Sequence, residues 1–115
     1  METINIFNNE FFVNPDKLLG VFKIKEDDLY ILKLEFLNQE VIHSSPYKEK
    51  YIQQYIDEIF PRFGSEFVKL KDSNGIVRKS SIMYINKGKA RLDNESLVEL
   101  DMDSFNLNKI KENDN

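Results

Sequence analysis

One segment of this chain repeats its apolar residues with the period of a helix, and turn signals divide the rest into short alternating runs. The helical face consists of Tyr47, Tyr51, Tyr55, Ile52, Ile56 and Ile59. Ser44-Ser45-Pro46 predicts the start of this helix, with a serine N-cap and proline at the first helical position. Pro61 and Gly64 predict its end near Phe60. The chain is therefore expected to hold one amphipathic helix among strands.

The alternating runs before the helix predict a hairpin. Residues 18–25 and 29–37 both alternate, and the polar turn Glu26-Asp27-Asp28 joins them. Shorter strands are expected at residues 3–7, 11–13 and 39–43. The first half of the chain thus predicts a small antiparallel sheet that leads into the helix.

A meander of strands is expected after the helix, and Asn74-Gly75 is its strongest turn signal. Strands are predicted at residues 66–71, 76–85, 89–93 and 97–102, with a last strand or edge segment through Phe105, Leu107 and Ile110. This order predicts an α+β fold that is mainly β. A small curled sheet or partly open β-barrel, with the amphipathic helix plugging one end, fits it best.

Size and composition predict one folded domain at residues 1–105, with a polar tail at 106–115 that frays. A chain of 115 residues fits one core, and nine Phe and five Tyr supply large buried area. The absence of cysteine excludes disulfides and thiolate metal sites. No secretory signal opens the chain, and no stretch approaches the roughly 18 apolar residues of a membrane span. We therefore expect a cytoplasmic protein with no membrane partner.

The net charge of −4 conceals a basic segment. Residues 69–91 carry seven basic residues and one acidic residue, which gives a net charge of +6. Residues 1–68 and 92–115 each have a net charge of −5. If this protein binds a partner, the basic segment is the place where binding is expected.

The predicted turns bring the basic side chains to one face of the meander. A two-residue turn at Asn74-Gly75 places Lys71 opposite Arg78, whereas a four-residue loop through Asp72 would change these pairs. A turn at Lys87-Gly88 places Tyr84 opposite Arg91. The predicted basic face, with Phe67 and Tyr84 as its aromatic members, is Phe67, Lys69, Lys71, Arg78, Tyr84, Lys89 and Arg91. Val68, Leu70, Val77, Met83 and Ile85 are expected on the opposite, core-facing side.

Three interpretations of the predicted basic face are open. Cations interleaved with aromatic rings suit RNA, or less often DNA, because the cations contact phosphates while the rings stack on bases. The same face suits an acidic protein partner. Lysines are also ordinary on the solvent side of a strand, where they protect sheet edges.

The sequence contains no motif that is typical of catalysis or of metal binding. His43 is the only histidine, and we expect it to end a strand. The glycines are isolated, and the paired carboxylates fit turns better than a calcium loop. We therefore predict no enzyme, no catalytic or metal-binding residue and no cofactor. Tyr47, Tyr51 and Tyr55 are expected as core residues or as a homodimer face.

The segment Val13-Asn14-Pro15-Asp16-Lys17-Leu18-Leu19-Gly20-Val21-Phe22-Lys23-Ile24 resembles the start of the PrgU-like family, small proteins of conjugative plasmids and transposons of low-GC bacteria. The resemblance implies a PUA-like β-barrel and a role in restraining gene expression through RNA, with no functional residue to carry over. The leading hypothesis is thus a non-enzymatic regulator of a mobile element that binds RNA. The alternative is a protein-interaction module, of the immunity or anti-defence type, that covers a partner's surface.

Overall fold

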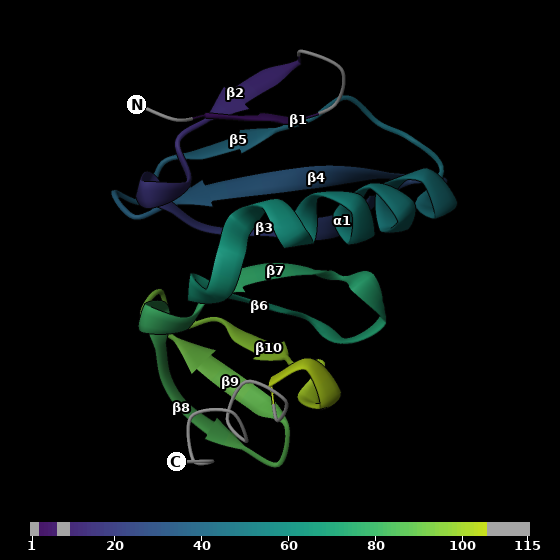
Figure 1. Ribbon diagram of the computed structural model, residues 1–115. Helices are drawn as coiled ribbons and strands as arrows, with labels where there is room; N and C mark the ends of the chain where they lie inside the picture. Colours follow the sequence, from purple (N-terminus) through teal and green to yellow (C-terminus); the bar gives the residue numbers. More distant parts are fainter. Residues whose placement is uncertain (1–2, 7–9, 106–115) are drawn as a thin grey trace.

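A computed structural model describes residues 3–6 and 10–105, and it confirms a mainly β, α+β fold (Figure 1). The strands before the helix are β1 (Ile4–Ile6), β2 (Phe11–Val13), β3 (Leu18–Glu26), β4 (Leu29–Phe36) and β5 (Val41–His43). Helix α1 (Glu49–Phe63) follows. The later strands are β6 (Phe67–Lys69), β7 (Gly75–Arg78), β8 (Ile82–Asn86), β9 (Lys89–Leu92) and β10 (Leu97–Glu99).

A five-stranded antiparallel sheet in the order β5-β4-β3-β7-β6 forms the centre of the molecule. Its longest pair is the predicted hairpin β3–β4, which closes with Glu26 opposite Leu29. Asp27 takes a positive φ of 55° in the connecting turn, a conformation that Asp tolerates better than most residues. The alternation in the sequence therefore identified the central hairpin correctly.

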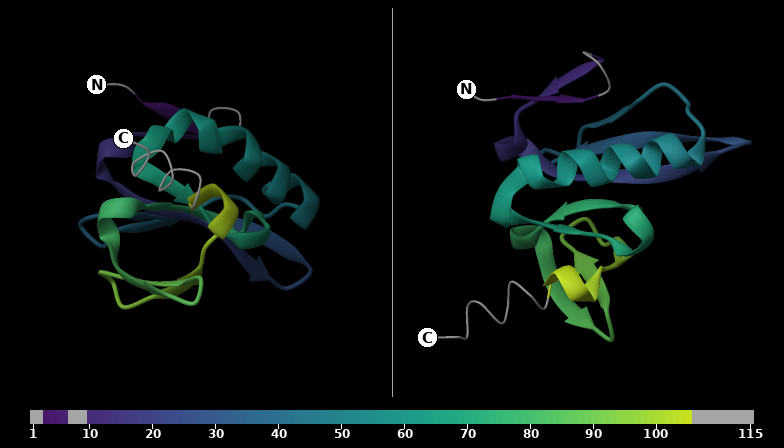
Figure 2. Two further views of the ribbon diagram at one scale, coloured as in Figure 1. Left: turned by 60° about the horizontal axis from the view of Figure 1, so that its bottom comes forward. Right: turned by 45° about the vertical axis from the view of Figure 1, so that its right-hand side comes forward.

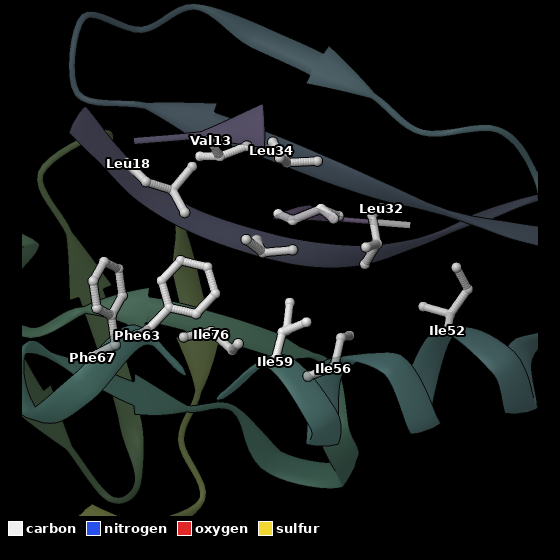
Figure 3. Close-up of a cluster of buried hydrophobic side chains, with 12 residues drawn as sticks. Val13, Leu18, Leu32, Leu34, Ile52, Ile56, Ile59, Phe63, Phe67 and Ile76 are labelled. Carbon is white, nitrogen blue, oxygen red and sulfur yellow. The ribbon is translucent and has the colours of Figure 1, made fainter. Parts of the chain in front are cut away.

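Helix α1 covers one face of this sheet and forms the first core with it (Figure 3). Ile52, Ile56, Ile59 and Phe63 recur on one side of the helix and are all buried. They pack against buried side chains of β3, β4, β6 and β7, among them Val21, Leu32, Leu34, Phe67 and Ile76. The hairpin β1–β2 adds Ile6 and Val13 to the same core. The helix thus lies across a sheet face and does not plug the end of a barrel.

A three-stranded sheet in the order β10-β9-β8 covers the other face of the five-stranded sheet (Figure 2). A second core fills the space between these two sheets: Leu19, Val68, Leu70 and Val77 pack against Ala90, Leu92 and Leu100. Neither these two sheets nor the β1–β2 pair closes into a barrel within the described residues. The molecule is layered as helix, five-stranded sheet and small sheet.

The run at residues 76–85, predicted as one strand, is two strands in two different sheets. A 3-10 turn at Lys79–Ser81 separates β7 from β8. Ser81 is buried in this bend, and its carbonyl accepts a hydrogen bond of 2.9 Å from the Asp93 N–H. The bend lets apolar residues on both of its sides enter the second core, which one straight strand would not allow.

The helix begins and ends later than predicted. Ser44 is not an N-cap, because its hydroxyl accepts a 2.8 Å hydrogen bond from the Leu32 N–H. Tyr47 pairs with Tyr30 of β4, and the helix starts only at Glu49. At the other end Pro61 lies within the last turn, and the helix continues past it to the buried Phe63.

We predict that Ser44→Ala lowers the free energy of unfolding by about 1–3 kcal/mol, because it leaves the buried Leu32 N–H without an acceptor. Urea denaturation monitored by circular dichroism measures the change. Ser45→Ala is the control, since Ser45 is exposed and its hydroxyl donates to the Glu10 carboxylate at the surface at 3.1 Å. Equal losses in the two variants would contradict a structural role for the Ser44 hydroxyl.

The described part of the chain ends in a helical turn at residues 102–105. Phe105 packs there against the second core and does not lie in a strand. Leu107, Ile110 and the predicted tail at 106–115 fall outside the described residues. Among the helices that are described, none has the length and apolar character needed to cross a membrane.

Candidate functional site

The pairing of β6 with β7 differs from the predicted register. Phe67 lies opposite Arg78, and the Leu70 N–H donates to the Gly75 carbonyl, so the connection is a four-residue loop. The two-residue turn at Asn74-Gly75 is therefore wrong, and the loop through Asp72 that the sequence left open is correct. Helix α1 holds this loop, because Gln53 donates to the Asp72 carbonyl at 3.2 Å and Asp57 accepts from Ser73 at 2.6 Å.

The new register buries two members of the predicted basic face. Phe67 is 1% exposed in the first core, and Arg78 is 9% exposed beside it. The Arg78 guanidinium lies 4.7 Å from the centre of the Phe67 ring. Its Nε donates to the Leu18 carbonyl at 2.8 Å, and its Nη2 donates to the Pro15 carbonyl. Phe67 and Arg78 therefore hold the fold together and do not form a binding surface.

Two further members of that face are at the surface but already have acidic partners. Lys69 forms an ion pair with Asp57 of helix α1, and Lys71 forms one with Glu99 at 3.0 Å. Burial alone would raise the pKa of the Asp57 carboxyl, but hydrogen bonds from Lys69 and Ser73 outweigh it and hold the pKa below its usual value. The hydrogen bond to Glu99 and its charge raise the pKa of Lys71. Both lysines have thus lost much of their attraction for an external anion.

The remaining three members, Tyr84, Lys89 and Arg91, lie together on the small sheet. Tyr84 is opposite Arg91 as predicted, and Arg91 is in turn opposite Leu97, so these three form a row across β8, β9 and β10. Lys89 lies between Asn86 and Glu99 in the next row. Since Ala90 and Leu92 of β9 pack into the second core, both rows lie on the side that faces away from it.

This side, which we call the outer face, consists of Met83, Tyr84, Asn86, Lys89, Arg91, Leu97 and Glu99. Met83, Tyr84 and Leu97 are 63%, 50% and 51% exposed. Met83 was expected in the core, but a register shift between Ile82 and Tyr84 turns it outward. Leu97 was not identified from the sequence, because counting across the predicted turn at 93–96 pairs it with Leu92, whereas the structure pairs it with Arg91.

The outer face combines exposed apolar side chains with cations. Arg91 is half-buried, and its Nη1 donates to the Glu95 carbonyl at 2.7 Å, which fixes the guanidinium beside Tyr84 and Leu97. Lys87 and Lys89 are exposed nearby, while the one carboxylate, Glu99, is paired with Lys71. The outer face is therefore apolar at its centre, with the cations Lys87, Lys89 and Arg91 beside the apolar side chains.

The described residues show no arrangement that suggests metal binding or a histidine-based active site. No group of three or more His, Asp or Glu side chains is placed to hold a metal ion in this part of the chain. His43 ends β5, as predicted, and lies exposed opposite Lys33.

The three tyrosines do not form one helical stripe. Tyr47 precedes the helix, and the Tyr55 hydroxyl donates to the Asn5 carbonyl at 3.0 Å. Tyr51 is 50% exposed on the first turns of α1. The stripe at helical spacing is thus wrong, and a homodimer through these residues stays a prediction.

Comparison of the chain with protein-family models, with curated proteins and with solved structures finds no match. The resemblance to the PrgU-like family and its PUA-like barrel therefore stays a prediction.

Proposed function

We propose that this protein acts by binding, as a non-enzymatic protein-interaction module, and that the outer face contacts an acidic surface of its partner. One observation carries the proposal. Met83, Tyr84 and Leu97 are exposed side by side around Arg91, whose guanidinium is held by a hydrogen bond to the Glu95 carbonyl. Met, Tyr and Arg are enriched at the centres of protein interfaces, where charged residues such as Lys are depleted. Covering a partner's surface, as an immunity or anti-defence protein does, is the activity that such a module would have.

The charge distribution supports a protein partner over a nucleic acid. Binding to a phosphate backbone depends on cations that release counterions, and three of the predicted cations already contact carboxylates within the molecule. Lys87, Lys89 and Arg91 are left to attract an acidic patch, which fits the rim of a protein interface.

RNA binding is the second candidate, and the position of Tyr84 favours it. Its exposed ring lies on a sheet surface directly opposite Arg91, where a base could stack while cations contact the backbone. In this form the site is smaller than the predicted basic face, because only Tyr84, Lys89 and Arg91 remain in it. Restraint of gene expression in a mobile element would be the corresponding role.

A photo-crosslinking experiment followed by a binding assay tests the proposal. The photoreactive amino acid p-benzoylphenylalanine is placed at Met83 in the native host, and the crosslinked protein is purified. Tyr84→Ala and Arg91→Glu are expected to weaken its binding by at least tenfold in calorimetry, as central interface residues do. Arg62→Glu is the matched control, because Arg62 is exposed on α1, on the other face of the five-stranded sheet.

A gel-shift assay with a random 20-nucleotide single-stranded RNA distinguishes the two candidates. We expect no binding beyond the weak, non-specific kind, with Kd of about 10⁻⁴–10⁻⁶ M at physiological salt. Nanomolar binding that weakens steeply with salt and disappears in Arg91→Glu would overturn the protein proposal in favour of RNA. No crosslinked protein from Met83 in the native host would also count against the proposal.

A further inference from the structure

A groove of about 570 Å³ lies between the β3–β4 hairpin and strand β10, beside the outer face. The residues that line it and carry the following argument are Phe22, Ile24, Lys25, Leu97, Val98 and Glu99. They come from two strands in two different sheets. Both strands have a free edge at this groove.

The free edge of β3 begins where β7 ends. β3 pairs with β7 only at Gly20, Val21 and Phe22, and the last bond on this side runs from the Lys23 N–H to the Asn74 carbonyl at 2.8 Å. Backbone groups of alternate residues point to the same side of a strand. The N–H and C=O of Lys25 therefore point toward the position that a longer β7 would occupy, and in the described structure no strand continues there.

The free edge of β10 follows from the same alternation. The Leu92 N–H donates to the Ser96 carbonyl, and the Leu100 N–H donates to the Gly88 carbonyl, each at 2.9 Å. The residues of β10 that bond to β9 are thus the even-numbered ones, and Leu97 and Glu99 direct their N–H and C=O groups away from β9. At this outer edge Leu70 forms a bridge with Leu100, and the Asp101 N–H donates to the Lys69 carbonyl at 2.9 Å, so residues 69–71 cover the edge at Glu99 and leave it open at Leu97.

The charges of the groove are balanced except at Lys25. Three carboxylates line it, and each is already within ion-pair distance of a lysine: Glu35 with Lys33 at 3.5 Å, Glu49 with Lys23 at 2.7 Å and Glu99 with Lys71 at 3.0 Å. Lys25 forms no ion pair with any described residue. An occupant of this groove is therefore favoured if it carries a negative charge beside Lys25.

We infer that this groove binds an extended acidic segment of a partner protein, which adds as a strand to the outer edge of β10. The outward N–H and C=O groups of Leu97 supply backbone hydrogen bonds to such a strand. Phe22, Ile24 and Leu97 contact its apolar side chains, and Lys25 pairs with its acidic side chain. The groove adjoins the outer face and shares Leu97 and Glu99 with it, but the inference does not depend on whether the outer face binds protein or RNA.

Panning the full chain against a phage-displayed library of random linear 12-residue peptides tests this inference. We expect enriched peptides in which apolar residues alternate and an Asp or Glu recurs at one position. Fluorescence polarisation with a labelled consensus peptide then measures the affinity. Hydrogen exchange followed by NMR should show the Leu97 amide protected when the peptide is bound.

Two variants distinguish the contribution of the backbone hydrogen bonds of Leu97 from that of the charge of Lys25. Leu97→Pro removes an outward N–H and leaves the bonds to β9 at Ser96 and Val98 in place, so we expect at least a tenfold loss of affinity. Leu97→Ala keeps the N–H and should lose less. Lys25→Glu changes only an exposed side chain, and we also expect at least a tenfold loss, whereas the exposed Lys17→Glu should bind as the wild type does.

Failure to enrich any peptide would overturn the inference, and so would wild-type affinity in Lys25→Glu. Peptides whose binding is lost in Tyr84→Ala and kept in Lys25→Glu would belong to the outer face instead. These outcomes are independent of the Met83 crosslink, so a failure of this inference is distinguishable from a failure of the proposed function.

Discussion

Arg78→Ala is expected to lower the free energy of unfolding by about 3–5 kcal/mol, which is a large part of the roughly 5–15 kcal/mol that stabilises a typical domain. The guanidinium of Arg78 donates to the carbonyls of Leu18 and Pro15, and it packs on the Phe67 ring. Alanine leaves buried carbonyl acceptors without donors and opens a cavity beside Phe67. Urea denaturation followed by circular dichroism and by tyrosine fluorescence measures the loss.

Arg62→Ala is the matched control, because Arg62 is exposed and should change stability by no more than about 0.5 kcal/mol. Arg78→Lys should fall between the alanine variant and the wild type, since lysine keeps the charge but cannot donate in the same fork geometry. If Arg78→Ala unfolded like the wild type, Arg78 would not have the structural role assigned here. It would then return to the set of candidate ligand-binding residues.

Gly75→Ala is expected to destabilise the protein by about 3 kcal/mol or more, because backbone strain and a steric clash add together at this position. A Cβ on Gly75 would lie 2.3 Å from the Val21 carbonyl oxygen and 3.1 Å from the Phe22 Cα. Gly75 also has a φ of +155°, which L-residues rarely adopt. The backbone of β7 would have to move away from β3 at the centre of the five-stranded sheet. The midpoint of urea denaturation should therefore fall sharply.

Gly64→Ala is the control, because it places alanine at a positive φ without the steric clash that occurs at Gly75. Gly64 has a φ of +77°, and nothing lies within 4 Å of the position that its Cβ would take. Its ψ of −169° places it in a backbone region that is essentially restricted to glycine, so its substitution should cost about 1–3 kcal/mol without any clash. Equal losses at Gly64 and Gly75 would show that the close contact with Val21 contributes nothing.

Local features of this fold could be predicted from the sequence because their causes lie within a few residues. The β3–β4 hairpin combines an alternating pattern with a two-residue polar turn, and its register follows from that turn alone. The turn at Lys87-Gly88 fixed the opposition of Tyr84 and Arg91 in the same way. The isoleucines of α1 were recognisable from their spacing.

The connection from β6 to β7 could not be predicted in this way. Asn74-Gly75 has the strongest local preference for a two-residue turn, yet Gln53 and Asp57 of the helix hold a four-residue loop instead. The glycine serves a different purpose, since it lets β7 approach the backbone of β3. Contacts with residues about 20 positions away therefore outweighed a local turn preference.

The candidate site likewise has one part that the sequence predicted and one part that only the tertiary structure decided. The distribution of charged residues along the sequence showed that residues 69–91 are basic, and strand alternation placed Tyr84 beside Arg91. Only the tertiary structure decided which of these cations are available, because the acceptors of Arg78 lie about 60 residues earlier in the chain and the carboxylate of Lys71 lies 28 residues later. The side chain of a strand residue points to one of two faces, but what covers that face depends on distant segments.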